Sequence, residues 1–222
     1  MENPGSESYY VVGEGLLDVA AGGRPRPLAP EVEAKAPPFR FSRMGPSGAG
    51  HQVGEKTRQR LAAAMTRDLQ QPWPARPIHV DVCYYVPEIG YAFTILPPHI
   101  TYASGDPSHQ GLIGFELLFH EASHTFADVE VEALSRACRA QGKDCGDLWH
   151  TLLFYTSGVE LGRLLPAAEQ RSFTPYAYKY GLYTRGDWPR YRRVLATDWQ
   201  AYLDGKTAFD AAIGEMATNL GQ

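Results

Sequence analysis

Apolar residues recur at helical spacing in three parts of the chain. In residues 55–70, Leu61, Met65 and Leu69 form one stripe, which predicts a helix that Pro72 and Pro74 end. Near the C-terminus, two further stripes predict a pair of core-forming helices separated by a stop at Asp204-Gly205. The first stripe comprises Tyr191, Val194, Leu195, Trp199 and Tyr202, and the second comprises Phe209, Ala212, Ile213, Met216 and Leu220.

Two nearly continuous apolar segments, residues 112–119 and 146–165, have the length of buried helices. Between them, residues 129–141 predict a connecting helix, and Gly142 predicts the turn after it. The chain can therefore run out along one buried helix and return along another. Side chains on the two buried helices would then lie close together.

Alternating or β-branched runs predict strands at residues 78–86, 91–96 and 99–104, and residues 8–19 can add a strand or hairpin. Residues 21–50 are rich in Pro and Gly, which predicts an irregular segment wrapped on the domain. We expect one α+β domain over residues 1–222, mostly helical with a small mixed sheet. It would consist of an irregular segment at 1–54, a core at 55–165 and a helical subregion at 166–222.

The composition fits a soluble globular protein that we expect to be a monomer. With 222 residues the chain can bury a sizeable core, and its net charge of −4 disfavours binding to nucleic acid. No apolar run reaches the roughly 18 residues of a membrane span, and the start lacks the basic flank and apolar core of a signal peptide. A removed leader would leave the location open, and we slightly favour a secreted or periplasmic protein over a cytoplasmic one.

Three cysteines are present. Cys138 and Cys145 flank the predicted turn at Gly142 and could close a small disulfide loop, whereas two free thiols are the alternative. Cys83 lies in an apolar strand and is expected to be a buried hydrophobe.

The strongest chemical signal is the segment His120-Glu121-Ala122-Ser123-His124, which continues the apolar run of residues 112–119. On a helix, His120 and His124 lie one turn apart with about 5–6 Å between their Cβ atoms, so both imidazoles can bind one zinc ion. Glu121 can then take a proton from the attacking water as general base. Burying two His and a Glu without partners would cost several kcal/mol.

A catalytic zinc needs a third protein ligand. His150, in the second buried helix, is the preferred candidate because it is the only histidine after the motif. Glu160 is the alternative ligand from the same segment. Glu130 occupies the position of the last ligand in H-E-x-x-H-x-x-G-x-x-H, but Ala127 stands where that motif needs Gly, so we discount it. His51, His79, His99 and His109 are expected to be surface or hydrogen-bonded residues.

The H-E-x-x-H segment resembles that of the zincin metallopeptidases, and residues 55–165 resemble the upper half of the zincin fold. A third ligand on a later helix is similar to the gluzincin layout, and the pattern His150-x-x-x-Phe154-Tyr155 is similar to that of SprT-like proteases. The resemblance implies a small sheet over the active-site helix, with residues 100–103 as an edge strand that pairs with extended substrate.

These observations predict zinc-dependent hydrolysis of a peptide or protein substrate. The oxyanion would be steadied by a phenol, either Tyr180 in the aromatic segment 173–183 or its rival Tyr155. The alternative is a non-catalytic zincin-fold module that binds zinc and serves recognition.

Overall fold

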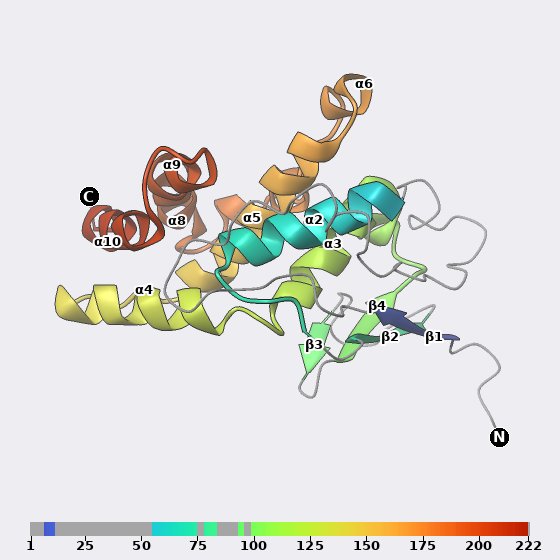
Figure 1. The fold of residues 1–222 in the computed structure, drawn as a ribbon, viewed down its shortest axis with the longest axis horizontal. Coiled ribbons are helices and arrows are strands. Elements are labelled where there is room, and N and C mark those ends of the chain that lie inside the picture. The colour runs from blue at the N-terminus through green and yellow to red at the C-terminus, as the bar shows by residue number, and fades with distance from the viewer. Residues whose placement is uncertain (1–6, 12–54, 75–77, 84–92, 96–98, 222) are drawn as a thin grey trace.

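The computed structural model describes residues 7–11, 55–74, 78–83, 93–95 and 99–221. Most of these residues are helical, which confirms that prediction (Figure 1). Most of the predicted irregular segment 1–54 lies outside the described residues, as do residues 12–19, 84–86, 91–92 and 96 of the predicted strands. Within the described residues, none of the helices is both long and apolar enough to cross a membrane.

Four described strands form one mixed sheet in the order β1-β2-β4-β3. They are β1 (Glu7–Val11), β2 (Ile78–Cys83), β3 (Phe93–Ile95) and β4 (His99–Ala103). β1 runs antiparallel to β2, β2 parallel to β4, and β3 antiparallel to β4. The prediction that residues 100–103 form an edge strand is therefore wrong, because these residues belong to β4, which lies between β2 and β3. Among the described strands, β3 is the one at the edge beside β4.

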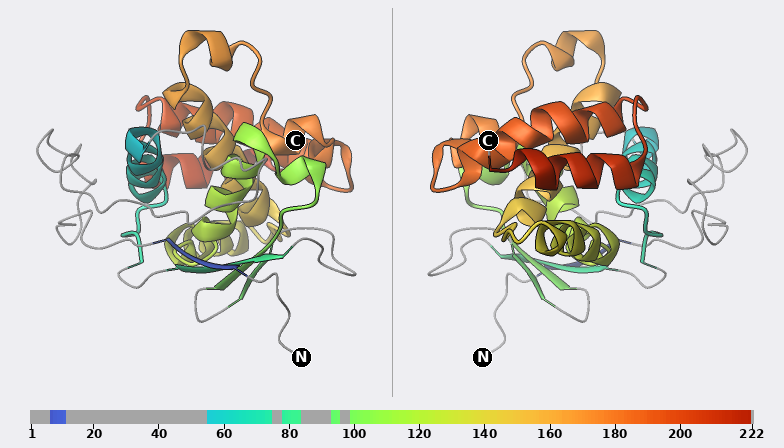
Figure 2. Two further views of the ribbon diagram at one scale, coloured as in Figure 1. Left: turned by 90° about the vertical axis from the view of Figure 1, so that its right-hand side faces the viewer. Right: turned by 90° about the vertical axis from the view of Figure 1, so that its left-hand side faces the viewer.

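Period-two burial of apolar side chains positions the sheet against the helices. Ile78, Val80 and Val82 of β2 are buried, as are Ile100 and Tyr102 of β4. Figure 2 shows the strands as a layer beneath the helices.

The short 3-10 helix at Pro107–His109 connects β4 to helix α3 (Gly111–Ser123), and the backbones pack closely there. The Tyr102 hydroxyl lies 2.8 Å from the carbonyl oxygens of both His109 and Gly114. A Cβ atom on Gly114 would stand 1.9 Å from the His109 carbonyl oxygen, so only glycine fits there. His109 itself is buried, with its Nδ1 2.8 Å from the Ala103 carbonyl oxygen.

The remaining core is helical and follows the predicted pattern closely. Helix α2 (Glu55–Asp68) buries Leu61 and Met65, and Leu69 is buried just after it. Helices α4 (Asp128–Ala140) and α5 (Leu148–Leu164) match the predicted connecting and buried helices, and Gly142 adopts a left-handed φ of +65° in the turn between them. α2 and α3 both pack on α5.

The C-terminal helices complete the core. They are α6 (Ala167–Gln170), α7 (Tyr176–Lys179), a 3-10 turn (Leu182–Thr184), α8 (Trp188–Val194), a π-helical segment (Leu195–Trp199), α9 (Gln200–Leu203) and α10 (Phe209–Asn219). Trp199 and Met216 from the two predicted stripes are fully buried. Gly205, at φ +72°, follows α9 and confirms the predicted helix stop.

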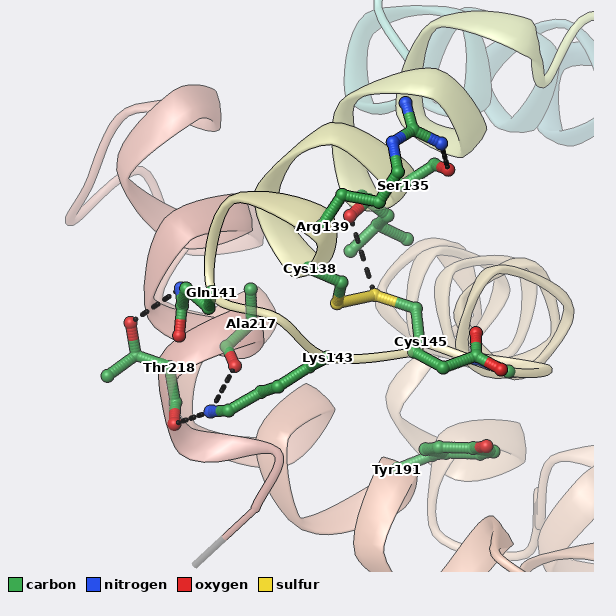
Figure 3. Close-up of a disulfide and its surroundings, with 12 residues drawn as sticks. Ser135, Cys138, Arg139, Gln141, Lys143, Cys145, Tyr191, Ala217 and Thr218 are labelled. Atoms are coloured by element: carbon green, nitrogen blue, oxygen red, sulfur yellow. Dashed lines mark hydrogen bonds between the residues drawn. A yellow bond between two sulfur atoms is a disulfide. The ribbon is translucent and has the colours of Figure 1, made fainter.

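Cys138 and Cys145 form a disulfide, the first of the two alternatives (Figure 3). It joins the end of α4 to the segment that enters α5. In the same turn, the Lys143 ammonium donates hydrogen bonds to the carbonyl oxygens of Ala217 (2.9 Å) and Thr218 (2.8 Å) on α10. The start of α5 is thus fixed to both α4 and α10. The Cys83 side chain lies outside the described part of the structure.

Candidate metal centre

Three histidine side chains converge at the interface of α3 and α5. The Nε2 atom of His120 lies 3.3 Å from Nε2 of His124 and 3.3 Å from Nε2 of His150. Within the described residues, these three form the group of His, Cys, Asp or Glu side chains that could hold a metal ion, with their ligand atoms within 4.8 Å of one another. The sequence-predicted set His120, His124 and His150 is therefore brought together in space.

Helix geometry and packing direct these rings at one point. His120 lies in the last turn of α3, and His124 is its C-cap residue in a helical conformation, so the helix ends one residue before the second histidine. His150 lies in the first turn of α5, which α4 and the disulfide-closed turn bring back beside α3. The Phe154 ring, one turn further along α5, stacks on His120 with 3.5 Å between ring centroids.

Burial keeps two of the imidazoles neutral. His120 is 1% exposed, and burial lowers its pKa well below its usual value, with His124 and His150 adding to the shift. Burial also lowers the pKa of His124 to about 4, and nearby His150 contributes, whereas the Asp147 carboxylate acts in the opposite direction. A neutral imidazole offers a lone pair, which is the form that binds a metal ion.

The distances suit a tetrahedral ion. Two nitrogen ligands at about 2.0–2.1 Å from a tetrahedral zinc are about 3.3 Å apart, which is the Nε2–Nε2 separation of His120 from both His124 and His150. Without an ion, His120 Nε2 has a single lone pair or a single N–H and can form a hydrogen bond with one of its two histidine neighbours but not with both. Three imidazoles are a donor set that zinc and several other transition metals accept. These residues therefore fit a metal ion.

Glu121 lies between the two motif histidines and is 5% exposed. The Thr94 hydroxyl, on the edge strand β3, lies 2.8 Å from both the Glu121 Oε2 atom and the Glu121 carbonyl oxygen. Burial raises the pKa of Glu121 to about 7, and the Thr94 hydrogen bond and His150 oppose that shift. A buried, oriented carboxyl with a pKa near neutrality can both accept and return a proton.

The two glutamates considered as third ligands have other surroundings. Glu160 is buried at the far end of α5, where one oxygen lies 2.6 Å from Arg163 Nη1 and the other 3.4 Å from Arg67 Nη2. Glu130 is fully buried at the start of α4, and neither of its carboxyl oxygens has a hydrogen-bond partner among the described residues. Neither belongs to the histidine cluster, which contains the preferred third ligand His150 and not the alternative Glu160.

The two phenols considered for oxyanion binding also differ. The Tyr155 hydroxyl donates a hydrogen bond to Gln200 Oε1 at 2.8 Å, so its partner lies in the C-terminal helices. Tyr180 caps α7, and its ring lies 4.8 Å from the ring of Tyr176, which in turn stacks on Phe154 at 5.7 Å. Tyr180 thus belongs to the aromatic layer next to the histidines, and its role stays a prediction.

Three neighbours of the site were not expected from the sequence: Thr94, Asp147 and Trp188. The Trp188 ring, on α8, lies 5.8 Å from the His150 ring. No local sequence pattern predicts that α8 packs beside His150. Asp147 could have been found, because position i−3 from His150 on a helix lies on the same face. Glu116, one turn before His120, is also buried and accepts a hydrogen bond from the backbone N–H of Tyr176 at 2.8 Å.

Comparisons with protein-family models, with curated proteins and with solved structures find no match to this chain. The geometry and chemistry of the site itself are therefore the basis for inferring its function.

Proposed function

We propose that this protein is a zinc-dependent peptidase whose metal ligands are His120, His124 and His150 and whose general base is Glu121. The observation that carries the proposal is the convergence of three imidazole Nε2 atoms beside a buried glutamate from the same helical turn. Three protein ligands leave a fourth position free, which is the pattern of catalytic zinc sites. Structural zinc sites instead use four side chains.

A zinc ion bound there would act as a Lewis acid that makes water a nucleophile near neutral pH and polarises a carbonyl. Glu121 would take the proton of the attacking water on a carboxylate oxygen and return it to the leaving amine. Thr94 supports this role because its hydroxyl holds Glu121 Oε2 in one orientation. Tyr180 is the proposed donor to the developing oxyanion.

We also propose that the fold is zincin-like and that the substrate is an extended peptide. The sheet lies against the motif helix, and its described edge strand β3 carries Thr94, which contacts Glu121. A peptide that pairs with β3 by backbone hydrogen bonds would pass beside the general base. The disulfide supports the proposal that the protein works in an oxidising compartment, as a secreted or periplasmic protein would.

The proposal is tested first by metal content and then by cleavage. Elemental analysis of protein purified without added metal should find about one zinc per chain, and a chelator should lower the melting temperature. A broad peptide library, analysed by mass spectrometry, should be cleaved by the zinc-loaded protein. Glu121→Gln should keep its zinc and lose cleavage by at least about 100-fold, the scale of general-base catalysis.

Glu116→Gln is the matched control, because Glu116 is also a buried glutamate of α3 but lies outside the cluster. It should keep both zinc and activity. Zinc binding without cleavage by the unaltered protein would overturn the peptidase proposal and leave a non-catalytic zinc-binding module. Absence of any bound transition metal would overturn the metal centre itself.

A further inference from the structure

The carboxylate of Asp147 is placed between one metal-site histidine and one wall of the site. Its Oδ2 atom lies 3.7 Å from Nδ1 of His150 and accepts a hydrogen bond from the indole Nε1–H of Trp188 at 3.1 Å. His150 Nε2 faces His120, so Nδ1 is the ring nitrogen that faces Asp147. A carboxylate oxygen has two lone pairs and can accept from both donors.

The position of Asp147 in its helix makes this placement informative. Asp147 is the N-cap residue of α5, where an aspartate side chain usually accepts a hydrogen bond from a backbone N–H of the first turn. No such side-chain cap is present, and the carboxylate lies against His150 and Trp188 instead. The residue thus forgoes a stabilising local hydrogen bond in favour of contacts at the metal site.

The charge that a metal ion would bring to the site also favours a role for Asp147. A divalent ion held by three neutral imidazoles would bring two positive charges into a largely buried site, and nearby anions stabilise such charge. Glu121 is one carboxyl group at the site, and Asp147 is a second.

We propose, on the basis of the proposed metal centre, that Asp147 is its positioning residue. When His150 Nε2 binds the ion, Asp147 accepts a hydrogen bond from His150 Nδ1–H and so fixes the tautomer and orientation of that ring. The 3.7 Å separation is too long for a hydrogen bond, and a small rotation of the imidazole or the carboxylate closes it. The contact to Trp188 holds the carboxylate in place from α8.

The experiment measures zinc affinity by competition with a chromophoric chelator, so it needs no catalytic activity. Asp147→Ala should weaken zinc binding by about 10–100-fold, the usual effect of losing an outer-shell partner of a metal-bound histidine. Asp147→Asn keeps an acceptor without the charge and should show a smaller loss, and Asp147→Glu should restore part of the affinity. The visible spectrum of the cobalt-substituted protein should change in Asp147→Ala, because the ligand ring is no longer held.

Two controls separate positioning from general effects. Trp188→Phe removes the indole N–H but leaves the carboxylate beside His150, and Asp187→Asn removes an exposed negative charge next to Trp188. Trp188→Phe should lose less zinc affinity than Asp147→Ala, because the carboxylate stays beside His150, and Asp187→Asn should bind zinc within about threefold of the unaltered protein, a margin well below the outer-shell effect. Circular dichroism checks that each variant folds.

Equal affinity of Asp147→Ala and the unaltered protein would overturn the positioning role and leave the metal centre intact. An equal loss in Asp187→Asn would also overturn it, because negative charge near the site rather than the contact to His150 would then explain the effect. Absence of zinc binding by the unaltered protein would instead overturn the metal centre and the positioning role with it.

Discussion

Removing the disulfide should destabilise the fold by an amount that its loop length sets. Cys138 and Cys145 are seven residues apart, so reduction frees a loop of about eight residues in the unfolded chain. The chain-entropy relation gives about 2.5 kcal/mol for such a loop at 25 °C. For a chain of about 220 residues, that free energy corresponds to a melting temperature lower by roughly 5–10 °C.

The perturbation is the double variant Cys138→Ala, Cys145→Ala, compared by calorimetry with the unaltered protein in the presence of a chelator, so that bound metal does not contribute. Reductant should lower the melting temperature of the unaltered protein to a similar extent and should not change that of the variant. Lys143→Met is a second comparison, because it removes the other tie of the same turn, to α10. A double variant that melts within about 2 °C of the unaltered protein would refute the loop-entropy reasoning.

Three further substitutions test other parts of the structure. Thr94→Val should leave zinc content unchanged but lower the rate of peptide cleavage about tenfold, because Glu121 loses the hydroxyl that orients it; an unchanged kcat would contradict this. Glu160→Gln should leave zinc affinity unchanged and lower the free energy of unfolding by about 1–3 kcal/mol, because the guanidinium of Arg163 loses its buried partner; lost zinc would return Glu160 to the ligand set. Burial raises the pKa of Glu130 to about 9, so its contribution is fully present below about pH 4.5 and is lost as the pH rises towards 9. Glu130→Gln should therefore match the unaltered protein in denaturant titrations at pH 4.5 and exceed its stability by up to about 3 kcal/mol at pH 7.

Local patterns predicted the helices because their signals lie within one element. The stripe Leu61, Met65, Leu69 and the run around His150 were readable at helical spacing, and all of these helices are present. Helix ends were less predictable: α3 ends at Ser123 although no proline, and no charged residue apart from Glu121, interrupts residues 117–126. The chain must turn there to begin α4, and no glycine or proline marks that turn.

Sheet order and the site neighbours could not be read in the same way. Strand order depends on which strands pair across long intervals of sequence, so the edge role assigned to residues 100–103 was wrong while the strand itself was found. Trp188 reaches His150 across 38 positions, and Thr94 reaches Glu121 across 27. The histidines were predictable because metal chemistry restricts their number and type, whereas neighbouring hydroxyl and aromatic groups follow no such rule.

His120 and His150 are held in different ways, and their burial explains the difference. His120 is 1% exposed and stacked on Phe154, so packing fixes its ring without a hydrogen bond to Nδ1, which has no partner among the described residues. The His150 side chain is 30% exposed, so packing encloses its ring less completely than that of His120. A polar partner is therefore most useful at His150, and Asp147 is the carboxylate within reach. The hydrogen bond from Trp188 to Asp147 also links this contact to α8. Polar contacts thus order the exposed side of the site, and aromatic packing orders the buried side.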